Sequence, residues 1–113
     1  MESWIEARQI VNQIYQLSNN TKFYHDYGLK DQIQRAYVSI MSNIAEDFDS
    51  GSNKSFINFL NYSYRSASEV QSLLYVSIDQ NYIDNNKFEE LMNYTIKIKN
   101  LIGGFIKYLK TKN

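Results

Sequence analysis

Apolar residues recur every three or four positions along most of the chain, a spacing that predicts amphipathic helices rather than strands. The clearest example is a helix from about Leu29 to Phe48, whose apolar stripe consists of Ile33, Tyr37, Ile40 and Ile44. A second stripe on this helix is polar and consists of Arg35, Ser39, Ser42 and Glu46, with Asn43 beside it. Because serine and asparagine are small, this stripe predicts that another helix approaches closely there.

The same spacing predicts three further helices. The first begins near Ser3, where Glu6 completes a capping box, and its apolar side consists of Trp4, Ala7, Val11, Ile14 and Tyr15. The third helix, from about Lys54 to Gln80, has a face made of Phe56, Leu60, Ser63, Ala67, Leu74 and Ile78. The fourth, from about Lys87 to Leu109, has a wide apolar stripe made of Phe88, Leu91, Met92, Thr95, Ile98, Ile102, Phe105 and Leu109.

Polar turn sequences separate the predicted helices at residues 18–20, 49–53 and 84–86. No strand-like alternation competes with the helical pattern. We therefore expect one all-α domain over residues 1–113, folded as an antiparallel up-down-up-down four-helix bundle. Gly103 and Gly104 interrupt the fourth stripe and cost about 1 kcal/mol each relative to alanine; they mark either close helix packing or a weak point.

The third helix also carries a second, mixed stripe, which consists of Phe59, Tyr62, Ser66, Glu69 and Leu73. A helix with two contact faces must contact something besides its neighbour in the same chain. The two mixed stripes therefore predict that copies of the chain associate as a homo-oligomer. Buried charges require partners, and arginine suits bidentate pairing with a carboxylate. We therefore expect Arg35 to be buried and hydrogen-bonded to Glu46 or Glu69.

Composition narrows the class of protein further. Proline is absent and only 4 glycines occur, which argues against a turn-rich all-β fold. Cysteine is absent, which excludes disulfides and thiolate metal sites and fits a reducing cytosol. The acidic N-terminus has no apolar run typical of a signal peptide, and no run approaches the roughly 20 apolar residues of a membrane span. We expect a cytoplasmic protein.

Charge is distributed unevenly although the net charge is +0. All the acidic residues precede position 91, whereas the remainder of the chain is basic and contains Lys97, Lys99, Lys107, Lys110 and Lys112. Together with Lys54, these lysines are candidates for contacts with the phosphates of nucleic acid. The alternative is that they complement the dipole at the C-terminus of the last helix.

Candidate chemistry is sparse in this sequence. Glu46 and Glu69 resemble a pair of catalytic carboxylates. Both, however, lie on helical stripes of small residues and near Arg35 or Arg65, so an ion pair with arginine explains them better. His25, the single histidine, lies in a connection and completes neither a catalytic triad nor the Glu-x-x-His spacing of a di-metal bundle. No phosphate-binding glycine loop is present. We expect no enzyme activity, metal or cofactor, and we attribute the aromatic stripes to core or interface rather than to base stacking.

Four segments resemble those of a known family. They are residues 28–46 (GLKDQIQRAYVSIMSNIAE), 56–60 (FINFL), 65–70 (RSASEV) and 81–83 (NYI). The family is that of the 23S rRNA intervening-sequence (S23-like) proteins, and it includes the accessory variability proteins of diversity-generating retroelements. The resemblance covers nearly the whole chain, including Trp4 and Ala7.

The resemblance implies a cytoplasmic bacterial four-helix bundle that has no catalytic activity and assembles as a ring-like homopentamer. For the accessory variability proteins it implies binding of RNA or DNA and of a reverse transcriptase through a basic surface. This chain departs from the family pattern at Met41, where proline is usual, and at Asp47, where glycine is usual. The loop at 47–54 is acidic here rather than basic, so a purely structural or protein-interaction scaffold stays open as the alternative function.

Overall fold

The computed structural model describes residues 5, 8–9, 12, 25–49 and 53–111, without the side chains of 44–49 and 53. Three long helices make up most of this part of the chain: α3 (Tyr27–Asp49), α4 (Asn53–Asp79) and α5 (Asn85–Thr111). The predicted all-α class is confirmed, and no strand occurs among the described residues. The predicted first helix lies outside the described residues except for four exposed helical positions, namely Ile5, Arg8, Gln9 and Asn12.

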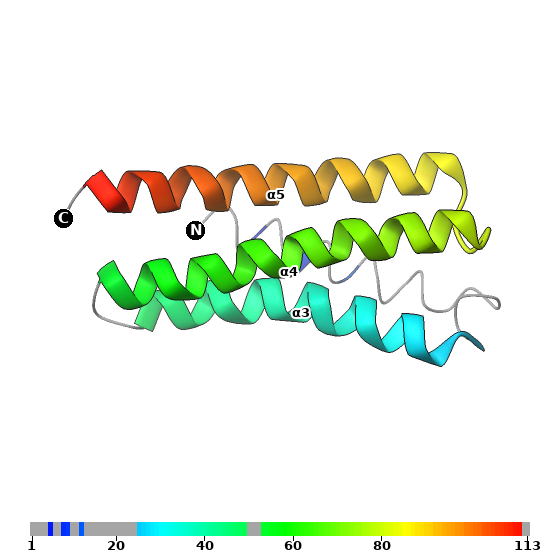
Figure 1. The fold of residues 1–113 in the computed structure, drawn as a ribbon, viewed down its shortest axis with the longest axis horizontal. Coiled ribbons are helices and arrows are strands. Elements are labelled where there is room, and N and C mark those ends of the chain that lie inside the picture. Colours follow the sequence, from blue (N-terminus) through cyan, green and yellow to red (C-terminus); the bar gives the residue numbers. More distant parts are fainter. Residues whose placement is uncertain (1–4, 6–7, 10–11, 13–24, 50–52, 112–113) are drawn as a thin grey trace.

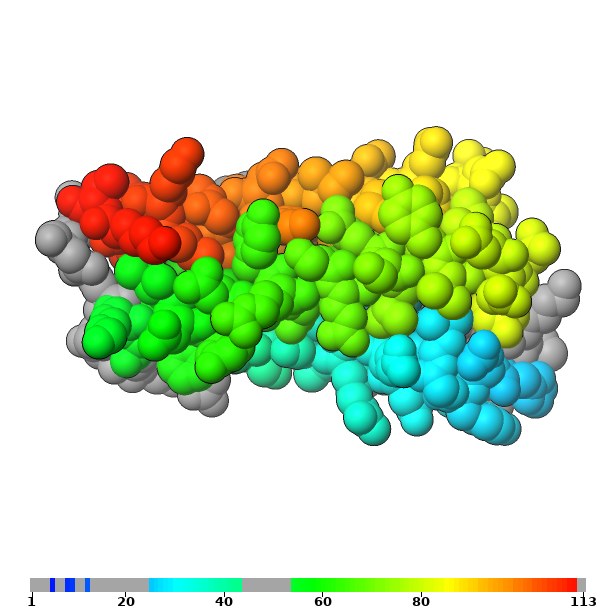
Figure 2. All heavy atoms as spheres, viewed as in Figure 1, coloured from blue at the N-terminus to red at the C-terminus, as the bar shows by residue number. Residues whose placement is uncertain are grey.

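Helix α4 runs antiparallel to both of its neighbours and lies between them (Figure 1). The end of α3, the start of α4 and the end of α5 lie at one end of the molecule, and the α4–α5 turn lies at the other. In the space-filling view α4 occupies the middle of the visible face, with α5 along one edge and α3 along the other (Figure 2). Two inter-helix seams therefore run along α4, one with each neighbour.

Aspartate side chains cap the N-termini of two of the helices. Oδ1 of Asp26 accepts the backbone N–H of Leu29 at 3.1 Å, so Asp26 is the N-cap of α3. Oδ1 of Asp84 accepts the N–H of Lys87 at 2.7 Å and caps α5 in the same way. Both helices begin two residues earlier than the sequence predicted, because these caps, rather than the apolar stripe, fix the first turn.

Helix α4 ends in a Schellman motif. Asn81 adopts a left-handed conformation with φ of 60°, and the N–H of Tyr82 donates to the carbonyl of Ser77 at 2.9 Å. The hydroxyl of Tyr82 then donates to Oδ2 of Asp26 at 2.8 Å. This bond ties the α4–α5 turn to the start of α3.

The core follows the predicted apolar stripes. Buried positions from these stripes include Ile33, Tyr37, Ile40, Leu60, Ala67, Leu74, Leu91, Met92, Ile98, Ile102 and Leu109. Leu29, Ala36, Val70 and Ile106 are also buried, although the sequence did not single them out. Among the described helices, none is both long enough and apolar enough to cross a membrane.

Candidate functional site

A polar seam joins α3 to α4, and it consists of Ser39, Asn43, Ser63 and Ser66. The hydroxyls of Ser39 and Ser66 are 2.9 Å apart. Nδ2 of Asn43 donates to the carbonyl oxygen of Ser39 at 2.8 Å and to its Oγ at 3.0 Å. Ser63 is fully buried and donates to the carbonyl of Ile40 at 3.0 Å. The small polar stripe therefore brings two helices of the same chain together.

The prediction that Arg35 is buried with a carboxylate is wrong for this chain. Arg35 and Glu69 are both exposed, and no ion pair joins them within the described residues. Ser42 is exposed as well, and the side chain of Glu46 lies outside the described residues. The physical reason is that the serine pair fills the seam, so the long charged side chains reach water and avoid the cost of desolvation.

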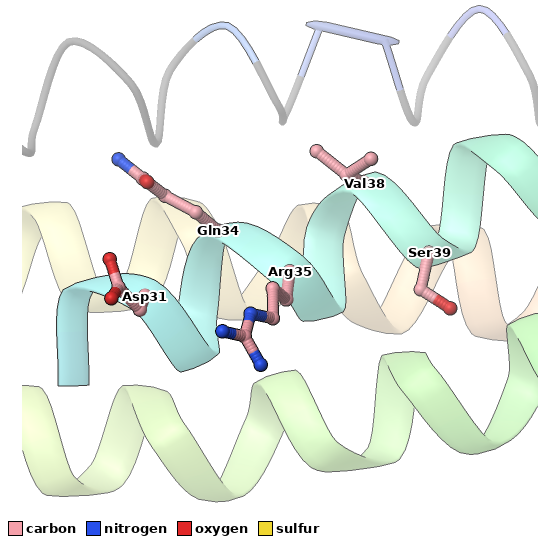
Figure 3. Close-up of a pocket in the computed structure, with 5 residues that line it drawn as sticks. All are labelled: Asp31, Gln34, Arg35, Val38 and Ser39. Atoms are coloured by element: carbon pink, nitrogen blue, oxygen red, sulfur yellow. The ribbon is translucent and has the colours of Figure 1, made fainter. Parts of the chain in front are cut away.

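Arg35 lies in an open groove of about 560 Å³ along α3. Arg35 and Ser39 point toward α4, whereas Gln34 and Val38 point to the opposite side of the helix (Figure 3). Ser39 supplies the hydroxyl in this groove, and that hydroxyl is bonded to Ser66 and Asn43 rather than to a base. The groove thus offers polar contacts but no activated nucleophile among the described residues.

An exposed surface flanks the polar seam, and we call it the α3/α4 face: Arg35, Ser42, Tyr62, Arg65 and Glu69. The Ser39–Ser66 pair sets an antiparallel register that puts Arg35 level with residues 69–70 and Ser42 level with 62–63. Tyr62 is 51% exposed, and the Arg65 guanidinium carbon lies 5.2 Å from the centre of the Tyr62 ring. Aromatic and arginine side chains of this kind are enriched at protein interfaces.

The other seam, between α4 and α5, contains a groove of about 350 Å³ that we call the lysine groove. Its described lining consists of Tyr64, Lys99, Asn100, Gly103, Gly104, Ile106, Lys107 and Lys110. Steps of four, four and three residues keep Lys99, Gly103, Lys107 and Lys110 on one side of α5. None of these lining residues is acidic, so the groove is positively charged.

Lys99 is held in place at the lysine groove. Its Nζ donates to Oε1 of Gln71 at 3.0 Å and lies 5.0 Å from the centre of the Tyr64 ring. Lys107 and Lys110 are exposed and form no ion pair or hydrogen bond with the described residues. Two of the three ammonium groups are thus available to an anion without first breaking a bond in the chain.

The structure brings together only part of the predicted lysine set. Lys97 lines a different groove with Glu90, Asn93 and Tyr94, so an acid is its neighbour. Lys54 is exposed at the start of α4, at the end of the molecule where α5 terminates (Figure 1). Lys112 lies outside the described residues.

Sequence reasoning missed Tyr64 and did not connect the glycines with the lysines. A Cβ at Gly103 would lie 3.4 Å from Cε2 of Tyr64, so the Tyr64 ring packs directly against α5 at this glycine. This is an ordinary van der Waals distance, so the packing at Gly103 does not require glycine. The available signal was the spacing of Lys99, Gly103 and Lys107, which places all three on one side of a helix.

His25 is exposed, and its ring meets the edge of the Tyr27 ring with centroids 6.5 Å apart. Within the described part of the chain, no three histidine or acidic side chains converge in a way that could hold a metal ion. The described residues therefore form no candidate metal site.

Comparison with known proteins agrees with this helical architecture. No curated protein matches the chain. One similar solved structure is that of a Bacteroides thetaiotaomicron protein of unknown function from the S23 ribosomal protein family. It is 32% identical and superposes with a TM-score of 0.81 over 94% of this chain and 93% of its own. The sequence pattern of the 23S rRNA-intervening sequence proteins matches residues 1–104. The chain therefore belongs to the 23S rRNA-intervening sequence protein family.

Proposed function

We propose that this protein is a non-enzymatic, self-associating four-helix bundle that binds nucleic acid through the lysine groove. One observation carries the nucleic-acid part. Three lysines and a tyrosine share one groove whose described lining has no acid. Phosphate contacts by lysine release counterions and supply most of the affinity of sequence-independent binding. The net charge of +0 does not prevent this, because the positive charge is local.

Two further parts of the proposal have their own support. The hydroxyls of Ser39, Ser63 and Thr95 are engaged in bonds within or between helices, which favours a structural over a catalytic use. For the fourth helix, the described positions Ile5, Arg8, Gln9 and Asn12 are helical and exposed, at the spacing of one outer helix face. Self-association would place several lysine grooves on one particle and raise the apparent affinity.

A paired substitution tests nucleic-acid binding. Lys107→Gln with Lys110→Gln removes two charges from the groove, and Lys30→Gln with Lys87→Gln removes two from elsewhere. Binding to labelled RNA and DNA is measured by fluorescence anisotropy over a series of salt concentrations. The groove variant should bind more weakly, with a salt slope flatter by about 0.7 to 0.9 per lost phosphate contact. The control variant should behave like the wild type.

The outcome separates nucleic-acid binding from the scaffold function. Absence of binding by the wild-type protein at low salt overturns the nucleic-acid proposal. Equal losses in the groove and control variants would assign binding to net charge rather than to the groove. If the wild-type protein does not bind nucleic acid, the second candidate function, a protein-interaction scaffold, remains. The observation that favours this function is the exposed α3/α4 face, with Tyr62 and Arg65 at its centre.

A further inference from the structure

The floor of the lysine groove contains a glycine that the packing of the chain does not require. A Cβ at Gly104 would meet nothing within 4 Å, and this position is exposed. At Gly103 an added Cβ would lie 3.4 Å from Cε2 of Tyr64, so this glycine lies directly against the ring. Glycine in the middle of a helix weakens the helix relative to alanine. The bare surface at Gly104 therefore has no explanation in the folding of this chain, and it leaves the backbone of α5 open to a molecule lying in the groove.

The lysines extend along the groove rather than clustering at one point. Lys99 and Lys110 are eleven residues apart, which corresponds to about 16 Å along a helix. Lys107 lies between them, closer to Lys110. This arrangement matches a chain of successive phosphates better than it matches a single phosphate.

An aromatic side chain stands beside the row of lysines. Tyr64 is 38% exposed, and its ring lies beside Lys99 and against the surface at Gly103. Proteins that bind single-stranded nucleic acid combine a positive groove that follows the backbone with aromatic rings against which bases stack. A duplex keeps its base faces stacked inside, so its phosphates would reach the lysines but no base would lie against the Tyr64 ring.

We propose that the lysine groove holds one unpaired strand of nucleic acid. The strand's phosphates lie on Lys99, Lys107 and Lys110, its backbone passes over Gly104, and a base lies against the exposed part of Tyr64. This inference rests on the proposed function, since it names the form of nucleic acid that the same groove takes.

The test uses a fluorescein-labelled RNA strand, a labelled DNA strand of the same sequence, and each strand annealed to its complement. Gly104→Gln places a neutral side chain over the groove floor at a helical position where glutamine is favourable. Ser72→Gln, at an exposed position of α4 outside the groove lining, is the matched control. Anisotropy gives the affinities, and thermal unfolding shows whether each variant is folded.

We expect the wild-type protein to bind at least one of the single strands more tightly than its duplex. Gly104→Gln should weaken single-strand binding about tenfold, within the range produced by losing one stacked base. Its melting temperature should be no lower than that of the wild type, and Ser72→Gln should bind normally.

Three results would overturn the inference, and they differ in whether the proposed nucleic-acid binding is also refuted. Equal or tighter binding of the duplexes removes the single-strand specificity but leaves nucleic-acid binding intact. Normal binding by Gly104→Gln removes the groove floor as the site, while the function of the protein as a nucleic-acid binder stands. Absence of binding to every probe removes the proposed function, and this inference falls with it.

Discussion

The hydroxyl of Tyr37 lies 3.3 Å from Oγ1 of Thr95 and joins α3 directly to α5 in the core. Both side chains are almost completely buried. Thr95 uses its own proton to bond the carbonyl of Leu91 at 2.8 Å, so Tyr37 must be the donor in the bond between the helices. The two hydroxyls thus form a directed chain that ends on the backbone of α5.

The direction of this chain predicts unequal effects of removing its two members. Thr95→Val removes the acceptor and leaves the Tyr37 hydroxyl buried without a partner, at a cost of about 1–3 kcal/mol. Tyr37→Phe leaves Thr95 bonded to Leu91 and should cost about 0.5–1.5 kcal/mol. Urea unfolding measures both, and the double variant should cost less than the sum of the single variants. Additive losses would contradict the predicted coupling.

Stability should fall at alkaline pH because of the same tyrosine. Burial raises the pKa of Tyr37 well above its ordinary value of 10.0. The folded chain keeps this proton above pH 10 while the unfolded chain releases it, so the stabilisation is complete below pH 10 and is lost as the pH rises. The free energy of unfolding should decrease by up to about 1.4 kcal/mol per pH unit through this group.

Two variants isolate this contribution to the pH dependence. Tyr37→Phe should flatten the loss of stability above pH 10, whereas Thr95→Val keeps the tyrosine buried and should retain the steep loss. The measurement is urea unfolding at several alkaline pH values. An equally steep loss in Tyr37→Phe would assign the alkaline transition to other groups, among them Tyr82, whose pKa is raised chiefly by its hydrogen bond to Asp26.

The helices and most of the core could be predicted from the sequence, because helical periodicity depends on residues close in the chain. The stripe of Ile33, Tyr37 and Ile40 is buried as expected. The starts of α3 and α5 were predicted two residues late, because the capping role of Asp26 and Asp84 is visible only once the backbone direction is known.

The candidate site was predicted less completely, because it depends on which residues meet across helices. The serine stripe indicated a close approach, and the Ser39–Ser66 bond places that approach within one chain. The position of Arg35 depended on whether serines or charges fill the seam, which spacing alone does not decide. Tyr64 and Lys99 are 35 positions apart in the sequence, so only the α4–α5 pairing shows that they share a groove.

Asp26 should be more important for stability than its position before α3 suggests. One carboxylate oxygen caps the helix through Leu29, and the other accepts the hydroxyl of Tyr82 from the α4–α5 turn. Asp26→Ala removes both contacts, and loss of the cap alone costs about 1 kcal/mol. Tyr82→Phe removes only the second contact, so in urea unfolding it should be the milder change. A larger loss in Tyr82→Phe would show that the cap contributes little.

The exposed α3/α4 face should be where copies of the chain meet. Arg35 and Glu69 lie level across the seam without forming an ion pair, so each has its charge available for a partner. Tyr62 adds a large apolar surface, half exposed and next to Arg65. A second copy brings the same arginines and the same acid, and oppositely charged groups can therefore pair between copies without a different protein being required.

Tyr62→Glu places a carboxylate at the centre of this face, where desolvation and the loss of the ring both oppose association. Light scattering after size-exclusion chromatography should show a lower particle mass for this variant than for the wild type. Ile96→Glu makes the same kind of change at an exposed position of α5 and should leave the mass unchanged. Unaltered thermal unfolding at low concentration shows that the fold is intact. A wild-type protein that is monomeric at micromolar concentration would refute self-association itself, whereas equal effects of the two variants would move the contact away from the α3/α4 face.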